Sequence, residues 1–284
     1  MIGYKHRYFN QMLWKETQGA LMPILQMKGY KGLSLFEAKA ILKDTKTYFI
    51  RWEESFDRLE NSPWWSVIND SNCDIHSLSA KTRSKVRKGS KHYVAEIVSR
   101  DVISNECYSV YVSAFDRYDT HECIISKKEF DDAINNLPQE TEFWIVRDRE
   151  TGEPTAFSEN YVANNVCAYI TTWYTPASLK KYSSYFLIQK MTSHYLERKD
   201  IDYVSNGTRN ISHDTNAHEL LERRFNFRKA YSELNIVYCL PLKILIKVSY
   251  PLRKLIERIP LPLFRKVSIL LAQEEIRRKC ALCS

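Results

Sequence analysis

The sequence predicts a mixed α/β fold of the α+β kind, in which helices flank a mostly antiparallel sheet and a helical tail closes the chain. Three observations predict it: a three-strand meander from Phe143 to Tyr174, a helix–strand–helix succession and an aromatic hairpin up to Tyr238, and basic amphipathic stretches beyond Pro241. Alternating apolar residues are typical of strands, whereas spacings of three and four residues are typical of helices.

The first part of the chain, residues 1–76, has the weakest pattern. Residues 8–18 and 34–42 are compatible with short helices, and residues 47–52 have the β-branched and aromatic composition of a strand. Further on, the sequence predicts a strand over residues 93–98 and a helix over residues 102–115.

A basic helix is expected between these regions. Ser77 or Ser79 is suited to cap it, and it extends to about Lys91. It carries six basic side chains: Lys81, Arg83, Lys85, Arg87, Lys88 and Lys91. Two interpretations stay open: a solvated helix that covers part of a sheet, or a helix that contacts phosphate on a lipid-linked substrate, a tRNA or a cofactor.

The meander has strands at residues 143–148, 154–163 and 166–174. Its turns, residues 150–153 and 163–165, contain residues that tolerate tight-turn dihedral angles. The third strand stops before Pro176. A helix at residues 180–199 follows, and then a short strand at residues 203–205 that ends in the turn signal Asn206-Gly207. A strand that leads into a helix N-terminus places backbone amides where an anion can bind.

Two motifs in this region resemble a known superfamily. Tyr174-Thr175-Pro176, followed by Leu187, resembles the strand end and pyrophosphate loop of GNAT-type acyl-CoA N-acyltransferases. The segment from Asn216 to Phe227 is similar to the second cofactor helix of these enzymes. Within the superfamily, the run at residues 181–185 most resembles the corresponding loop of Fem-type and related cell-envelope transferases. The resemblance covers residues 143–240.

This resemblance implies a splayed, GNAT-like sheet and transfer of an acyl group from coenzyme A, with no metal. It also implies a set of donor-binding residues: Tyr174, Thr175, Lys181, Tyr182, Ser183, Ser184, Tyr185 and Asn216. The chain departs from the family pattern at three points. Tyr182 and Ser184 replace loop glycines, Leu221 replaces a tyrosine that serves as general acid, and Asn226 replaces a glycine before Phe227.

The candidate catalytic residues follow from the needs of N-acyl transfer, in which a base removes a proton from the amine and an acid protonates the leaving thiolate. Glu159 interrupts an apolar strand and is the first candidate for the base, although an outward-facing side chain explains it equally well. His213, in the loop before the second cofactor helix, is a further candidate base. Tyr174 and Tyr231 are candidate proton donors, and structural roles remain open for each. Arg209 is suited either to a substrate anion or to a local ion pair.

Composition restricts the cellular setting. The chain has 284 residues, with 44% hydrophobic and 27% charged residues, as in ordinary globular proteins. Neither an apolar run long enough to cross a membrane nor a signal peptide is expected. Seven cysteines without a disulfide framework indicate reduced thiols and a cytoplasmic protein, and Cys280-x-x-Cys283 alone is a weak metal motif.

The tail carries most of the net charge. Ten Lys/Arg and three Glu follow Pro241, a net charge of +7, whereas the preceding 240 residues carry 32 basic and 31 acidic side chains. Two interpretations stay open: docking to an anionic membrane surface at the inner face of the membrane, or packing as a helical lid. The sequence predicts three parts. Residues 1–76 form a divergent N-terminal part, for which a partial second GNAT half is one interpretation; residues 77–240 form the acyltransferase domain, and residues 241–284 form the tail.

The leading hypothesis is an N-acyltransferase that moves an acyl group, first of all acetyl, from acyl-CoA to an amine of a sugar or lipid-linked envelope intermediate. Fem-like transfer from aminoacyl-tRNA and an inactive, membrane-associated GNAT-fold scaffold are the alternatives. If the loop binds the donor, bulky acids at Ser183 and Ser184 are expected to abolish binding without unfolding the protein.

Overall fold

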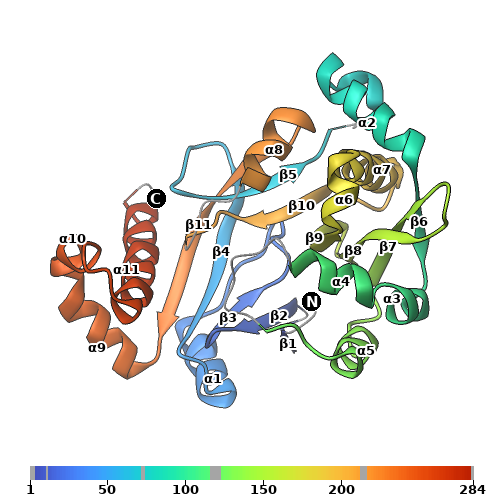
Figure 1. The fold of residues 1–284 in the computed structure, drawn as a ribbon. Coiled ribbons are helices and arrows are strands. Elements are labelled where there is room, and N and C mark those ends of the chain that lie inside the picture. Colours follow the sequence, from blue (N-terminus) through green and yellow to red (C-terminus); the bar gives the residue numbers. More distant parts are fainter. Residues whose placement is uncertain (1–3, 11, 72–73, 116–122, 212–215, 283–284) are drawn as a thin grey trace. The chain divides into compact units, whose positions relative to one another are not determined.

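The computed structural model describes residues 4–10, 12–71, 74–115, 123–211 and 216–282 (Figure 1). The chain forms two compact units. Unit 1 comprises residues 68–206 and 217–228 together with the first three residues, and unit 2 comprises residues 4–67, 207–216 and 229–284. Each unit is therefore assembled from segments that lie far apart in the sequence.

Unit 1 contains the predicted meander. Its strands follow the order β10-β9-β8-β7-β6, and all neighbours are antiparallel except β9 and β10. The strands are β6 (Tyr93–Val98), β7 (Thr141–Asp148), β8 (Pro154–Ala163), β9 (Val166–Tyr174) and β10 (Tyr203–Thr208), whose last two residues belong to unit 2.

The turns of the meander explain its regularity. Asn164 and Asn165 both have positive φ angles, 52° and 60°, and join β8 to β9 as a two-residue hairpin loop. Such loops match the right-handed twist of paired strands. Gly152, at φ 74°, makes the turn before β8. The predicted three-strand meander is confirmed.

Strands β9 and β10 separate soon after they begin. Tyr203, Val204 and Ser205 pair in parallel with residues 166–168. Strand β9 then continues to Tyr174, and in the described part of the chain no residue of β10 pairs with these last positions. The sheet is therefore open at this point, as the predicted splayed sheet requires.

Helices cover both faces of this sheet (Figure 1). Helix α7 (Ser183–Glu197) packs on one face, where Trp144 Nε1 donates a hydrogen bond to Tyr195 Oη at 3.1 Å. Aromatic side chains from α4 and α5 pack on the other, where the rings of Phe130 and Phe157 are 6.2 Å apart. The helices on this side are α3 (Arg100–Glu106), α4 (Tyr108–Phe115) and α5 (Lys127–Asn135). The single helix predicted over residues 102–115 is wrong. The segment forms two helices, because the backbone at Cys107 leaves the helical conformation, with φ −99° and ψ 0°.

The remaining helical segments of unit 1 include the predicted basic helix. Ser79 caps α2 (Ala80–His92) by accepting a hydrogen bond from Thr82 N. The others are η1 (Ile75–Ser77), α6 (Pro176–Lys180) and α8 (Asn216–Arg224), whose first residue belongs to unit 2.

Unit 2 has the strand order β1-β2-β3-β4-β11. The helix predicted over residues 8–18 is wrong: the segment forms β1 (Lys5–Phe9) and β2 (Met12–Thr17), with Asn10 at φ 49° between them. Met12, Leu13 and Trp14 are consecutive and all buried, which a strand covered on both faces permits. The other strands are β3 (Ala20–Pro23), β4 (Phe49–Arg58), β5 (Trp64–Asn69), which ends in unit 1, and β11, which begins there.

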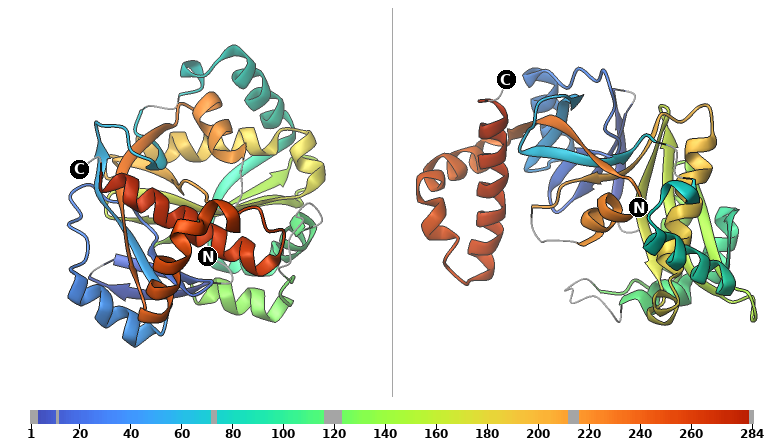
Figure 2. Two further views of the ribbon diagram at one scale, coloured as in Figure 1. Left: turned by 90° about the vertical axis from the view of Figure 1, so that its left-hand side faces the viewer. Right: turned by 90° about the horizontal axis from the view of Figure 1, so that it is seen from above.

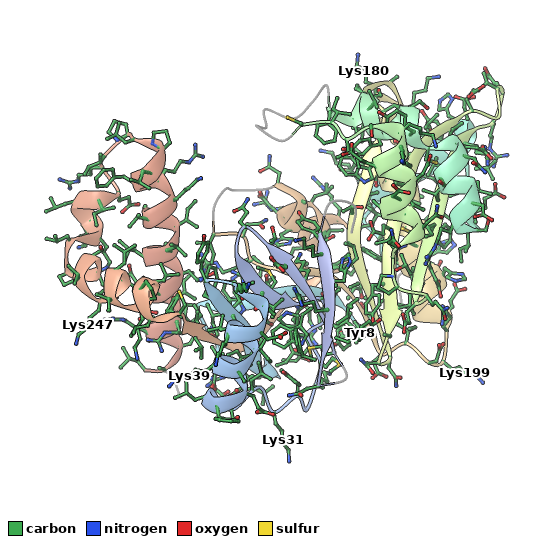
Figure 3. The ribbon with its side chains drawn as sticks, turned by 90° about the horizontal axis from the view of Figure 1, so that it is seen from below. Tyr8, Lys31, Lys39, Lys180, Lys199 and Lys247 are labelled. Atoms are coloured by element: carbon green, nitrogen blue, oxygen red, sulfur yellow. The ribbon has the colours of Figure 1, made fainter. Side chains whose placement is uncertain are left out.

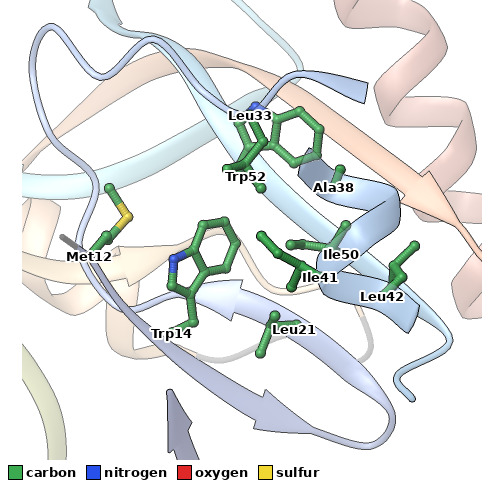
Figure 4. Close-up of a cluster of buried hydrophobic side chains, with 9 residues drawn as sticks. All are labelled: Met12, Trp14, Leu21, Leu33, Ala38, Ile41, Leu42, Ile50 and Trp52. Atoms are coloured by element: carbon green, nitrogen blue, oxygen red, sulfur yellow. The ribbon is translucent and has the colours of Figure 1, made fainter. Parts of the chain in front are cut away.

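Helix α1 (Leu35–Thr45) covers one core of unit 2 and confirms the helix predicted over residues 34–42. Ser34 and Glu37 form a capping box at its start. The buried core combines side chains of α1 with those of β2, β3 and β4 (Figure 4): Met12, Trp14, Leu21, Leu33, Ala38, Ile41, Leu42, Ile50 and Trp52.

The end of the chain forms one long strand and a helical hairpin. Strand β11 (Arg228–Tyr238) is continuous, so the aromatic hairpin predicted to close at Tyr238 is wrong. Helices α9 (Leu240–Ser249), η2 (Tyr250–Leu252), α10 (Arg253–Ile256) and α11 (Pro262–Cys280) follow, and the red helices α9 and α11 lie side by side (Figure 2). Prolines stand in the first turns of α9, η2 and α11, where the missing amide hydrogen costs no helical hydrogen bond. Within the described residues, no helix is both long and apolar enough to span a bilayer.

Candidate active site

The open edge of β9 leads directly into the segment that resembles a pyrophosphate loop. This segment contains one turn of helix, α6, which separates β9 from α7. Thr175 caps α6 through a hydrogen bond that its Oγ1 accepts from Ser178 N at 3.3 Å, and Pro176 occupies the first turn. Lys181 is exposed and ends α6. The helix predicted over residues 180–199 therefore begins later, at Ser183.

Helix α7 starts with an uncommon backbone conformation. Tyr182, its N-cap residue, has φ 65° and ψ 30°, and its side chain does not cap the helix. Non-glycine residues rarely adopt this left-handed conformation, which glycine adopts readily. Tyr182 stands where the family motif has a glycine, and it adopts a backbone conformation that suits glycine while it places an aromatic ring at the helix N-terminus.

The first amides of α7 form an anion-binding arrangement. The first amides of an α-helix have no acceptor within the helix, and in α7 these are the amides of Ser183, Ser184 and Tyr185. The next amide, Phe186 N, donates to Tyr182 O at 3.2 Å. Unpaired amides and the helix dipole together create a partial positive charge at such a position. A phosphate or pyrophosphate is the type of ligand that helix N-termini bind.

The two serines of this turn differ in environment. Ser183 is fully buried, and its hydroxyl donates to Ser178 Oγ at 2.9 Å, so its side chain joins α6 to α7. Ser184 is half-buried. Only the backbone amide of Ser183 is therefore suited to a ligand. The expectation that an acid at this position leaves the fold intact conflicts with this burial, because it would place a charge in the interior.

Helix α2 packs tightly against the start of α7. A Cβ atom on Gly89 would lie 2.8 Å from both Phe186 Cβ and Tyr182 O, so only glycine permits this approach. Lys85 Nζ lies 4.5 Å from the centre of the Tyr185 ring and donates to Tyr185 Oη at 3.1 Å. Lys88 Nζ lies 5.8 Å from the Tyr182 ring centre. Two lysines therefore reach the rings that flank the free amides.

The second motif lies at the same place in unit 1. The rings of Tyr185 and Phe225 are 5.5 Å apart, and Asn226 Nδ2 donates to Ser77 Oγ at 3.2 Å. Asn226 has φ 58°, the conformation for which asparagine substitutes for glycine at a helix end. Leu221 is buried, and its carbonyl accepts hydrogen bonds from the amides of Phe225 and Phe227. The segments around residues 77–89, 182–186 and 221–227 thus form one cluster.

Glu159 lies inside unit 1, on β8. Its side chain has no exposed surface, and Thr171 Oγ1 donates to its Oε2 at 3.5 Å. It shares the sheet face of Phe157, since side chains two apart on a strand share a face. Opposite it, β9 has an extra residue, Ile170, that forms a β-bulge. Bulges occur frequently beside active sites, where they redirect backbone groups.

The other predicted site residues have different placements. Tyr174 is half-buried at the end of β9, beside Thr175. Asn216 is exposed and begins α8, and Tyr231 lies in unit 2, where it pairs with Arg58 on β4. His213 lies outside the described residues. These placements leave the assigned roles as predictions.

The structure gives local contacts for Arg209 and Cys280, which the sequence analysis also considered. Arg209 Nη1 donates to Pro63 O at 2.6 Å, so the guanidinium joins two loops of unit 2. Cys280 is buried 3.5 Å from Ser62 Oγ, and its motif partner Cys283 lies outside the described residues. Lys85 and Lys88 belong to the basic helix for which contact with phosphate was one of two interpretations, whereas Gly89 and Ser77 are not among the predicted site residues. A glycine within that helix was a signal for its close contact with α7, because a glycine retained in a helix indicates close packing.

Comparisons with known proteins identify the fold. No family model matches the chain, and no curated protein matches it in sequence. FemX matches with a TM-score of 0.54 and 10% identity, over 86% of this chain and 90% of that chain. The C-terminal domain of a putative lysylphosphatidylglycerol synthetase from Agrobacterium fabrum matches with a TM-score of 0.52 and 11% identity, over 87% and 89%. L-PGS from Bacillus licheniformis matches with a TM-score of 0.50 and 11% identity, over 97% and 90%. The chain thus shares its fold with FemX and with the two lysylphosphatidylglycerol synthetase structures.

Proposed function

We propose that this protein is an acyltransferase that transfers an acyl group from a coenzyme A thioester to an amine of a sugar or lipid-linked envelope intermediate. The separation of β9 from β10 carries the proposal. It leaves the end of β9 without a parallel neighbour in unit 1, and this end leads through α6 to the first amides of α7. A donor with a pantetheine arm and a pyrophosphate has the shape and charge that these two features require.

The chain's own residues supply the binding functions. The amides of Ser183, Ser184 and Tyr185 receive the pyrophosphate, and Lys85 and Lys88 add positive charge beside it. A backbone amide of β9 beside the bulge at Ile170 polarises the carbonyl. The thioester supplies the activated acyl group when it is bound.

Proton transfer falls to two side chains of the same strand pair. Glu159 on β8 is the proposed base that takes the proton of the amine, and its burial implies relay through water. Tyr174 at the end of β9 is the proposed acid for the leaving thiolate, because Leu221 has no ionisable group. His213 and Tyr231 remain alternative candidates for the base and the acid.

A second donor class is favoured by specific observations. Lysine side chains lie over the rings of Tyr182 and Tyr185, and this basic, aromatic surface also suits the phosphates and bases of a nucleic acid. The resemblance of residues 181–185 to the loop of Fem-type transferases supports the same donor. Aminoacyl-tRNA is therefore the alternative donor, and an inactive scaffold remains the alternative outside catalysis.

Isothermal titration with coenzyme A, acetyl-CoA and longer thioesters tests the proposal. The wild type is expected to bind at least one of them, and the Lys85→Ala/Lys88→Ala variant to bind about tenfold to a hundredfold more weakly, since charge-assisted hydrogen bonds are lost. Arg87→Ala is the matched control, because Arg87 is exposed on the same helix about 200° away from Lys85. Ser184→Glu is expected to abolish binding.

Each alternative has its own result. The alternative donor would be assigned to the site if the wild type binds charged tRNA but no thioester, and if the double-lysine variant loses this tRNA binding. If no donor of either class binds, the transferase proposal fails and the scaffold interpretation replaces it. Thermal unfolding of each variant establishes that the fold is intact.

A further inference from the structure

Helix α9 is apolar on two opposite sides. Leu242 packs against a core cluster of unit 2 that includes Trp64 and Ile236, and Ile246 is buried. Leu240, Ile244 and Val248 recur every four residues and lie about 120° to 160° around the helix from Leu242 and Ile246. Their exposed fractions are 70%, 56% and 67%. A surface helix normally carries polar residues on its outer side, so this apolar stripe needs another explanation.

The segment that follows extends the same pattern. Leu255, Leu261 and Leu263 are exposed by 53% to 69%. Residues 240–266, from α9 to the first turn of α11, contain seven basic residues and one acidic residue, a net charge of +6. The exposed basic residues are Lys243, Lys247, Lys254, Arg258, Arg265 and Lys266. In the described part of the chain, these six form no ion pair, and Lys247 extends away from the ribbon (Figure 3). We call residues 240–266 the tail surface.

The basic side chains are placed to flank the apolar stripe. On α9, Lys243 and Lys247 project about 60° and 20° from Leu240, on the side away from Ile244. Long basic side chains in this position extend past apolar neighbours and place their charge at the level of lipid headgroups. Exposed apolar groups combined with an excess of Lys/Arg are the pattern of helices that lie in a membrane interface.

We propose that the tail surface docks onto an anionic lipid bilayer. Charge favours this occupant over a second copy of the chain, because two surfaces of net charge +6 repel each other, whereas anionic headgroups attract them. The inference concerns residues other than the proposed donor site, and its test does not depend on transfer activity. Docking through the tail surface would bring the protein to lipid-linked substrates.

Vesicle co-sedimentation with the full chain tests this proposal. The wild type is expected to bind vesicles that contain phosphatidylglycerol and to remain in solution with phosphatidylcholine alone. Lys243→Gln/Lys247→Gln should weaken binding roughly fivefold per lysine, and Leu240→Ser/Ile244→Ser/Val248→Ser at least about tenfold. High salt should weaken wild-type binding.

Helix α1 of the same unit offers matched controls. Phe36, Lys39 and Lys43 are exposed there, so Phe36→Ser and Lys39→Gln/Lys43→Gln should bind vesicles as the wild type does. Equal loss in these controls, or unchanged binding in the α9 variants, would overturn the proposal. So would a wild type that ignores anionic vesicles. Sedimentation velocity tests whether a second copy of the chain binds the tail surface instead. If the wild type does not bind vesicles but is a dimer, and the α9 serine variant is a monomer, the surface serves self-association.

Discussion

At the scale of single residues, the proposed proton transfer depends on Glu159. A carboxyl group without exposed surface, held by Thr171 beside a bulge, has no evident value for folding alone. Glu159→Gln retains the shape and the acceptor oxygen, and we expect it to lower kcat about a hundredfold to ten-thousandfold while donor affinity stays unchanged. Steady-state kinetics and titration measure the two quantities. Thr171→Ser, which keeps the hydroxyl, is the control; full activity of Glu159→Gln would remove this residue from the mechanism.

A second buried carboxyl group, Glu53 on β4, affects stability. Its Oε2 accepts hydrogen bonds from Ser66 and Ser232 at 3.3 Å each, and burial raises the pKa of Glu53 from 4.5 to about 7. The folded state therefore holds this proton more strongly than the unfolded chain does. The contribution of Glu53 to stability is therefore largest below about pH 4.5, falls as the pH rises to about 7 and is constant above it, a loss on the order of 3 kcal/mol from this one group.

The pH dependence can be assigned with a variant. Glu53→Gln should lose much less stability than the wild type between pH 5 and pH 8 in urea unfolding, because the group no longer ionises. Glu60→Gln, at an exposed position of unit 2, should follow the wild type. Equal losses in all three proteins would show that Glu53 does not titrate in this range.

At the scale of elements, the contact between α2 and α7 determines the site. A glycine in a helix normally costs about 1 kcal/mol relative to alanine, so Gly→Ala usually stabilises. At Gly89 the added methyl group would meet Phe186 Cβ and Tyr182 O at 2.8 Å, and overpacking of this kind costs about 1–3 kcal/mol. We therefore expect Gly89→Ala to destabilise the protein in urea unfolding. It should also weaken donor binding, because it moves Lys85 from the start of α7.

The contact at Gly89 and helix propensity predict opposite changes in stability, so a control on the same helix separates them. Ser84 is exposed on α2, and Ser84→Ala should be neutral or slightly stabilising, as helix propensity alone predicts. A Gly89→Ala variant that gains stability like this control would mean that the two helices do not touch at this point in solution.

At the scale of the whole molecule, the two proposed activities use different units. The donor site belongs to unit 1, and the tail surface belongs to unit 2. The chain passes between the units within β5, β10 and α8 and near the start of β11, so neither unit is a continuous segment. The donor titration and the vesicle experiment are consequently independent, and variants on α9 should bind the donor as the wild type does.

The sequence by itself determined the features that depend on neighbouring residues. Asn164, Asn165 and Gly152 set the turns of the meander, and Ser34 and Ser79 cap the helices that they precede. The prolines of the tail occupy first turns of its helices. Dihedral preferences and capping hydrogen bonds act over a few residues, so a short window of sequence contains their cause.

Only the tertiary structure decided which of these elements meet. Residues 8–18 form strands because neighbouring strands and α1 cover Met12, Leu13 and Trp14. Lys85 and Tyr185 are a hundred residues apart in sequence, and their contact depends on how α2 packs against α7. The burial of Ser183 and the exposure of Ile244 likewise depend on surrounding elements. Such contacts depend on the packing of the whole chain, so a short window of sequence does not predict them.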